Sequence, residues 1–390
     1  VVNIIDGALN NSKINVNTEL VDIYKSWIKE NPFDEGNGWA SEPWFQKEYV
    51  PDESVVKSAR EKSDVAVIVI GRTAGEDRDN APEKGSWYLT DEEEQLLDVV
   101  SKYFENTVVL LNVGNILDMN WVEKYNIKVV MYVWQGGQEG GNAIADVLSG
   151  DVNPSGRLSD TIAKDISDYP SSKNFGNKDF NLYQEDIYVG YRYFETFAPD
   201  KVLYPFGFGL SYTDFEIEPY SVTKNNEKIS AVVIVKNIGN VSGREVVQVY
   251  VEAPQGKLGK AKRSLCAFAK TSIIAPDKSD GLLIEMDIAD LASYDDSGIT
   301  GHKSCYVLEA GEYSIYIGKN VRDAEKVFTF TIDELTVTEQ LTEALAPERD
   351  FDVLYSTDDF KPAYRSASKR TVDYDKRIAD NLPKTIEYTG

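Results

Sequence analysis

A charged loop brings together five residues of types that take part in acid–base chemistry. Its charged side chains follow directly after an apolar run that ends at Gly71, and they are Arg72, Glu76, Asp77, Arg78 and Asp79. A carboxyl group can donate and accept protons when its surroundings move its pKa toward the working pH, and neighbouring carboxylates and arginines shift that pKa in opposite directions. On residue types alone, a solvated connection between two elements is the commoner origin of such a charge run.

The elements on either side of the loop predict where it lies. The run from Val65 to Ile70 predicts a strand buried on both faces, because it is almost continuously apolar. Thr90 predicts the N-cap of a helix, since Glu93 follows three residues later and completes a capping box. Open α/β sheets bind ligands at the carboxyl ends of their strands. The loop is therefore expected at the ligand-binding edge of such a sheet.

The alternation of strand and helix continues after the loop. Further strands are expected at 107–113 and 127–133, and helices at 91–104, 117–124 and 139–149. This alternation predicts an open α/β sandwich with a doubly wound, mostly parallel sheet, to which we assign residues 1–212. Upstream, helices are expected at 19–29 and 54–62. Val1–Ile5 is a weak candidate for a first strand, so we expect a domain that is incomplete at its N-terminus.

A second, all-β domain is expected at residues 213–339. Six or seven short strands separated by turn residues predict an antiparallel β-sandwich. The clearest of these strands are 228–236, 245–252, 263–268, 282–286, 311–317 and 326–332. Aromatic residues crowd two preceding stretches, 183–194 and 204–212, where packing between domains is favoured over the wall of a sugar pocket. Residues 340–390 are polar and poor in pattern, which predicts a linker or strap.

Composition argues against several other classes of function. The formal net charge of -24 offers no basic stripe to a nucleic acid and disfavours binding to anionic membranes. No apolar window is long enough for a membrane-spanning helix. No cysteine and histidine cluster has metal-ligand spacing, and the lone His302 is expected at the surface, so neither a metal nor a cofactor is predicted. Two cysteines make no disulfide framework. We favour a cytoplasmic location, and secretion stays open.

A glycine-rich loop at residues 134–141 raises the alternative of a nucleotide-dependent enzyme. It lacks the Gly-Lys-Ser/Thr ending of a phosphate loop, and its glycines do not have the spacing of a dinucleotide-binding turn. These glycines suit a tight turn or a close approach of the backbone. We therefore expect no nucleotide site there.

The charged loop carries two motifs, Gly-Arg-Thr-Ala-Gly-Glu at 71–76 and Gly-Ser-Trp-Tyr-Leu-Thr-Asp at 85–91. Together they resemble the acid/base loop of glycoside hydrolase family 3. Asp77 stands where the family commonly has a second glycine, and Asn80 where it commonly has an arginine. Four further motifs of the family follow in order, at 136–143, 153–158, 183–193 and 204–215. The resemblance covers residues from about 60 to 335.

This resemblance implies a retaining glycosidase, which works with two carboxyl groups. Glu76 matches the general acid/base, and we expect Arg72 and Asp79 to bind the substrate beside it. The nucleophile of the family is an aspartate on a (β/α)₈ barrel, and no stretch of this sequence resembles that barrel. A minority of members place the barrel after their fibronectin type III-like domain, which corresponds here to 213–339. The strap at 340–390 would then lead toward the barrel.

The resemblance further implies an exo-acting β-glucosidase whose substrate is a β-glucoside or a β-linked gluco-oligosaccharide, with β-xylosidase as the next activity. Because the nucleophile is expected elsewhere, the chain alone is expected to be inactive, and its partner is the domain or chain that holds the barrel. Oligomer formation is left open. The alternative is a non-catalytic carbohydrate-binding or scaffolding protein with the same folds, because a fold alone does not establish an activity.

Overall fold

The computed structural model describes residues 1–38, 41–73, 79–372 and 376 of the 390-residue chain. It divides the chain into two compact units. The first unit comprises Val1–Pro154 and Ile162–Asp168, and the second comprises Ser155–Thr161 and Tyr169–Gly390.

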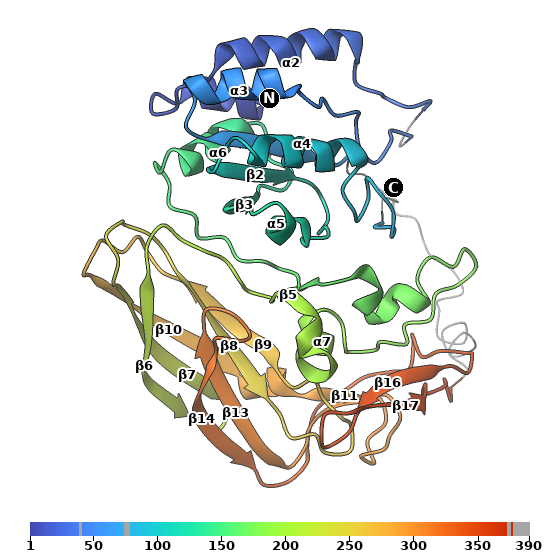
Figure 1. Cartoon of the computed structure of the whole chain (residues 1–390). Helices are drawn as coiled ribbons and strands as arrows, with labels where there is room; N and C mark the ends of the chain where they lie inside the picture. The colour runs from blue at the N-terminus through green and yellow to red at the C-terminus, as the bar shows by residue number, and fades with distance from the viewer. Residues whose placement is uncertain (39–40, 74–78, 373–375, 377–390) are drawn as a thin grey trace, which may run out of the picture. The chain divides into compact units, whose positions relative to one another are not determined.

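The first unit contains a three-stranded parallel sheet with the strand order β1-β2-β3, of which Figure 1 labels β2 and β3. Its strands are β1 Ala66–Gly71, β2 Thr107–Asn112 and β3 Val129–Tyr132. Its helices are α1 Ile4–Asn10, α2 Thr18–Glu30, α3 Glu53–Lys62, α4 Asp91–Ser101, α5 Trp121–Lys124 and α6 Gly140–Leu148. The central strand β2 is the most deeply buried, since Val109, Leu110 and Leu111 have no exposed surface. The predicted alternation of parallel strands and helices is confirmed.

Two predictions for the first unit are wrong. The strand around β1 is not buried on both faces: Ile68 and Ile70 are buried, but Val67 on the opposite face is 46% exposed. Successive side chains of a strand point to opposite faces, so an apolar run does not by itself show that both faces are covered. Val1–Ile5 is not a strand, because α1 begins there. The side chain of Asn3 accepts a hydrogen bond from the Asp6 amide at 2.9 Å and caps that helix.

The second unit contains the predicted antiparallel β-sandwich. One sheet has the order β10-β7-β6 and another has the order β14-β13-β8-β9; these strands are labelled in Figure 1. The strands are β6 Phe215–Lys224, β7 Lys228–Asn237, β8 Val246–Glu252, β9 Ser264–Lys270, β10 Ser279–Asp287, β13 Gly311–Gly318 and β14 Glu325–Ile332. The inward-facing residues form one core that includes Val233, Val249 and Ile315. A smaller sheet joins β11 Ser293–Asp295, β12 Cys305–Leu308 and β15 Thr336–Gln340.

The aromatic stretches before the sandwich pack largely onto it. They include α7 Tyr191–Phe197, β5 Val202–Tyr204 and the 3₁₀ turn Pro199–Lys201. The ring of Tyr191 stacks on Phe206 with a centroid distance of 4.5 Å and meets Tyr250 of β8 edge-on. These rings are used for packing, but within the second unit, so packing between domains stays a prediction. Tyr183 at the start of the first stretch is 73% exposed.

The segment expected as an irregular strap contains regular structure. β16 Asp352–Ser356 and β17 Pro362–Ser366 form an antiparallel hairpin in which Val353 and Leu354 are buried. The expectation of an unpatterned strap is therefore wrong for this part of 340–390. Its place between two domains stays a prediction.

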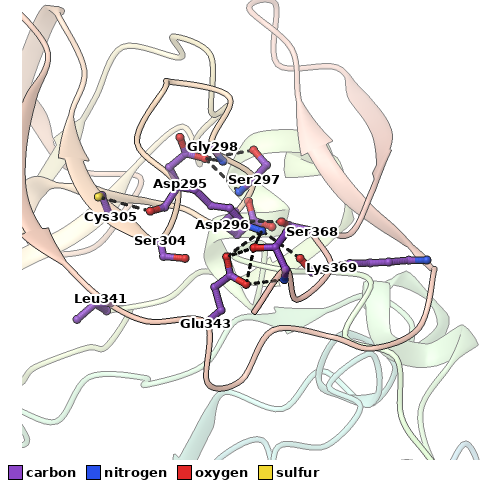
Figure 2. A network of polar contacts seen from close by, with 12 residues as sticks. Asp295, Asp296, Ser297, Gly298, Ser304, Cys305, Leu341, Glu343, Ser368 and Lys369 are labelled. Atoms are coloured by element: carbon purple, nitrogen blue, oxygen red, sulfur yellow. Dashed lines mark hydrogen bonds and ion pairs between the residues drawn. The ribbon is translucent and has the colours of Figure 1, made fainter. Parts of the chain in front are cut away.

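Polar contacts hold the ends of this segment against the smaller sheet of the second unit. Lys303 forms an ion pair with Glu343 at 3.0 Å and donates to the Lys369 carbonyl. The Ser368 hydroxyl donates to the Asp296 carbonyl at 2.7 Å. Figure 2 shows Glu343, Ser368 and Lys369 gathered around the loop of Asp296.

Candidate active site

The candidate loop leaves the carboxyl end of β1 and returns at the first turn of α4. The predicted capping box is present: the Thr90 hydroxyl accepts from the Glu93 amide at 3.1 Å, and the Thr90 amide donates to the Glu93 carboxylate at 2.9 Å. This arrangement satisfies amide groups that have no partner within the helix. The start of α4 therefore gives the returning end of the loop a rigid base.

Arg72 lies at the leaving end of the loop and is buried rather than presented to solvent. Its guanidinium forms two hydrogen bonds with the Glu93 carboxylate, at 2.5 and 2.9 Å. The side chains of this pair are only 4% and 6% exposed. Arg72 also donates to the carbonyls of Gly71 at 2.8 Å, Tyr88 at 3.4 Å and Ser86 at 3.5 Å. Its donors are thus directed at protein groups of both loop ends, and direct contact with a sugar stays a prediction.

The loop has further anchors between its two ends. The Thr73 amide donates to the Trp44 carbonyl at 2.8 Å, and the Thr73 hydroxyl donates to the Pro43 carbonyl. On the other side, the Asn80 amide group donates to the Ile116 carbonyl at 2.9 Å. The five residues between Thr73 and Asp79 are therefore flanked by anchored positions.

Gly85 packs closely on the ring of Phe45. Its φ of +82° is a conformation that glycine adopts without strain, and a Cβ there would lie 2.0 Å from the Phe45 ring. The contact ties the returning side of the loop to the segment that also holds Thr73.

Glu76, Asp77 and Arg78 lie outside the described residues. The role of Glu76 as the general acid/base therefore stays a prediction. Asp79 is described, and its side chain is exposed. The structure thus brings Arg72 together with Glu93, and Asp79 is exposed.

Two residues beside the loop between β1 and α4 were not predicted as site residues. Glu93 was identified only as a helix cap, and nothing in the local sequence indicates that it also pairs with Arg72. Glu48 lies in the loop before α3, and burial raises its pKa to about 7, an effect that the nearby Glu93 carboxylate reinforces. Its carboxylate accepts from the Tyr49 amide at 2.7 Å, which opposes the shift. No periodicity or motif marks Glu48 in the sequence.

Acidic and aromatic groups also gather beyond the carboxyl end of β2. Burial raises the pKa of Asp118, while hydrogen bonds from Asn120 oppose that shift. Burial and the carboxylates of Asp165 and Asp118 raise the pKa of Tyr88. Because Asn80 is bonded to Ile116, two residues before Asp118, the carboxyl ends of β1 and β2 carry neighbouring polar groups. This is the edge at which an open α/β sheet binds ligands.

Among the described residues, no group of three or more histidine, cysteine, aspartate or glutamate side chains could hold a metal ion. None of the described helices has the length and apolarity that crossing a membrane requires. His302 is exposed, as predicted.

Comparison with known proteins agrees with the α/β unit and the β-sandwich described above. The glycosyl hydrolase family 3 C-terminal domain matches residues 10–212, and the fibronectin type III-like domain matches residues 245–321. A β-glucosidase of Ruminococcus albus is 49% identical over 390 residues, which cover 100% of this chain and 41% of that protein. β-Glucosidase A of Butyrivibrio fibrisolvens is 39% identical, covering 78% of this chain and 42% of that protein.

Solved structures give the same result. The β-glucosidase of Paenibacillus barengoltzii superposes with a TM-score of 0.95 at 48% identity, covering 100% of this chain and 44% of that one. β-Glucosidase 3B of Thermotoga neapolitana superposes with a TM-score of 0.77 at 35% identity, covering 86% and 47%. This chain spans less than half the length of these relatives. On the match of its α/β unit, its sandwich and these relatives, the chain belongs to glycoside hydrolase family 3.

Proposed function

We propose that this chain is part of a retaining, exo-acting β-glucosidase and supplies Glu76 as its general acid/base. The observation that carries the proposal is the loop itself: a family acid/base motif lies between two anchored ends at the carboxyl edge of a parallel sheet. The relatives are named β-glucosidases, and one structure of the Thermotoga neapolitana enzyme is a complex with glucose. These names support a β-glucoside or β-linked gluco-oligosaccharide as substrate.

The proposed chemistry uses two carboxyl groups about 5–5.5 Å apart. Glu76 protonates the leaving oxygen while an aspartate nucleophile attacks the anomeric carbon, and Glu76 then takes a proton from the water that releases the sugar. The nucleophile belongs to a (β/α)₈ barrel outside this chain, which the relatives' greater length can accommodate. We propose Asp79, which is exposed, as a substrate contact near that reaction.

The charge of Arg72 bears on the proton that Glu76 must carry. An unpaired arginine favours the ionised form of any carboxyl group within about 4–6 Å. The buried carboxylate of Glu93 pairs with Arg72 and offsets that charge. This pairing is compatible with the role of Glu76, which must be protonated to act as an acid.

The test is Glu76→Gln in the full-length protein, measured on two β-glucosides. Hydrolysis of an alkyl glucoside, whose leaving group needs a proton, should fall by about 10²–10⁴-fold, the usual contribution of general acid catalysis. Hydrolysis of 2,4-dinitrophenyl β-glucoside, whose leaving group needs none, should fall far less in the glycosylation step. The neighbouring Asp77→Asn serves as the matched control. Equal losses on both substrates would make Glu76 a structural residue.

A second test addresses the division of the active site. The purified chain by itself should give no turnover of an aryl β-glucoside under conditions where the full-length protein is active. Turnover by the isolated chain would contradict the proposal that the nucleophile lies outside it. A full-length protein that binds glucose but hydrolyses no β-glycoside would instead support the carbohydrate-binding alternative.

A further inference from the structure

One buried side chain, that of Arg72, contacts the chain at both ends of the loop that connects β1 to α4. Arg72 stands where the chain leaves β1, and its guanidinium reaches across to the carbonyls of Ser86 and Tyr88, where the chain returns. Both ends of the loop are thereby tied to a single planar group. The guanidinium group has donors in a fixed planar geometry, so it constrains the relative orientation of the two loop ends as well as the distance between them.

Glu93 in turn fixes that planar group. One carboxylate oxygen accepts from Arg72, and the other accepts from both Arg72 and the Thr90 amide. The Glu93 residue is 5% exposed and Arg72 is 7% exposed, so water does not compete effectively for either. The same carboxylate therefore joins the leaving end of the loop to the first turn of α4.

Helix capping alone does not require a glutamate at this position. Glutamine serves as well as glutamate as the third residue of a capping box, because only a side-chain acceptor for the N-cap amide is needed. Two parallel hydrogen bonds to an arginine, however, require both oxygens of a carboxylate. The pairing with Arg72 therefore explains why residue 93 is a glutamate, whereas the helix cap alone does not.

We propose that Glu93, acting through Arg72, is a positioning residue that holds the acid/base loop for catalysis. The inference rests on the proposed role of Glu76 for its kinetic consequence, but the clamp itself is a property of the described residues. Proton transfer requires the carboxyl within hydrogen-bond reach of the leaving oxygen, and a misplacement of about 1 Å costs on the order of 10²-fold in rate. Loss of the clamp should therefore act on the step that needs a proton.

The experiment uses Glu93→Gln in the full-length protein, with Arg72→Lys as a second variant. Glu93→Gln retains the helix cap but loses the charge and one acceptor, whereas Arg72→Lys retains the charge but loses the planar group of donors. The matched control is Glu309→Gln, which makes the same chemical change in another buried pair. Glu309 pairs with Lys260 in the second unit, and both side chains are 6% exposed.

Two readouts are compared at a temperature where every variant is folded. Hydrogen–deuterium exchange of peptides covering 72–90 should be about tenfold faster in Glu93→Gln and Arg72→Lys than in the unaltered protein, and unchanged in Glu309→Gln. The value of kcat/KM for an alkyl glucoside should fall about 10–100-fold in the first two variants, and by less than about threefold for 2,4-dinitrophenyl β-glucoside. The double variant should be no worse than the more affected single variant, because both changes break one link.

The hydrogen–deuterium exchange measurement distinguishes failure of the positioning role of Glu93 from failure of the proposed role of Glu76. Unchanged exchange at 72–90 in Glu93→Gln and Arg72→Lys would overturn the positioning role, whatever the kinetics show. Faster exchange with equal losses on the two substrates would overturn it as well, because a general loss of folded enzyme does not depend on the leaving group. If Glu76→Gln itself showed equal losses, the proposed acid/base would fail. Faster exchange in that case would still support Glu93 and Arg72 as the clamp of the loop.

Discussion

The hydroxyl of Tyr188 accepts a hydrogen bond from the backbone amide of Ser356 at 3.0 Å, across 168 residues of sequence. Both residues are buried, and the Leu354 amide next to this contact donates to the Gln184 carbonyl at 2.6 Å. The β16–β17 hairpin is therefore attached to the loop of 183–188 within the second unit by one hydrogen bond to a side chain and one to the backbone.

Tyr188→Phe should lower the free energy of unfolding by about 1–3 kcal/mol, because the buried Ser356 amide loses its acceptor. The measurement is chemical denaturation of the chain, with proteolysis of the hairpin as a local readout. Tyr355→Phe is the control, since the hydroxyl of Tyr355 makes only a 3.4 Å contact with the Lys257 carbonyl in an exposed setting. A hairpin that stays resistant to protease in Tyr188→Phe would show that the contact contributes little.

Glu48→Gln should make stability less dependent on pH. The native pKa of Glu48 is raised to about 7 from an ordinary value of 4.5, mainly by burial. Its contribution to stability is therefore complete below pH 4.5 and is lost as the pH rises through 7. The variant should match the unaltered protein near pH 4 and exceed its free energy of unfolding at pH 8 by roughly 1–3 kcal/mol.

The measurement is urea denaturation at several pH values, and the exposed Glu30→Gln on α2 is the control. A difference between Glu48→Gln and the unaltered protein that stays constant from pH 4 to pH 8 would contradict a shifted ionisation of Glu48. It would point instead to a difference in packing.

Local sequence determines the parts of the fold that were predicted well. The capping box at Thr90 and Glu93 depends on residues three apart, and the strands of the sandwich depend on alternation within a few residues. The loop after β1 could be placed because the carboxyl end of a parallel strand is where such sheets bind ligands.

The features that could not be predicted from the sequence depend on contacts between residues far apart in the chain. Arg72 and Glu93 are 21 residues apart and meet only when α4 packs beside β1, so no local pattern marks their pair. The raised pKa of Glu48 follows from burial by elements distant in sequence. The strands β16 and β17 have only five residues each, and the docking of the hairpin on Tyr188 is what buries Leu354.

Glu245→Gln should destabilise the second unit far more than the same change at a surface pair. Glu245 pairs with Arg157 of the Asn-Pro-Ser-Gly-Arg-Leu motif, and their side chains are 2% and 9% exposed. Removing one charge leaves the other buried without compensation, which costs on the order of 3–5 kcal/mol. Glu53→Gln at the exposed Lys57–Glu53 pair should change stability little. Thermal unfolding of both variants checks the contrast, and similar shifts in Tm would contradict it.

Gly207→Ala should loosen the aromatic stretch from the sandwich. Gly207 has a φ of +81°, and a Cβ there would lie 2.2 Å from the side-chain oxygen of Gln248. Gln248 donates to the Gly207 carbonyl at 3.2 Å and accepts from the Tyr250 hydroxyl at 2.6 Å, so a displaced Gln248 leaves buried groups unpaired. We expect a loss of about 2–4 kcal/mol from this strain and the broken hydrogen bonds.

Gly156→Ala is the matched control for Gly207→Ala, because a Cβ at Gly156 meets no atom within 4 Å and its φ needs no glycine. Denaturation followed by tyrosine fluorescence compares the two variants, since the Tyr191 ring stacks on Phe206 next to the altered residue. If Gly207→Ala were as stable as Gly156→Ala, Gln248 would have to adopt another position without cost, and its hydrogen bonds would not hold the aromatic stretch in place.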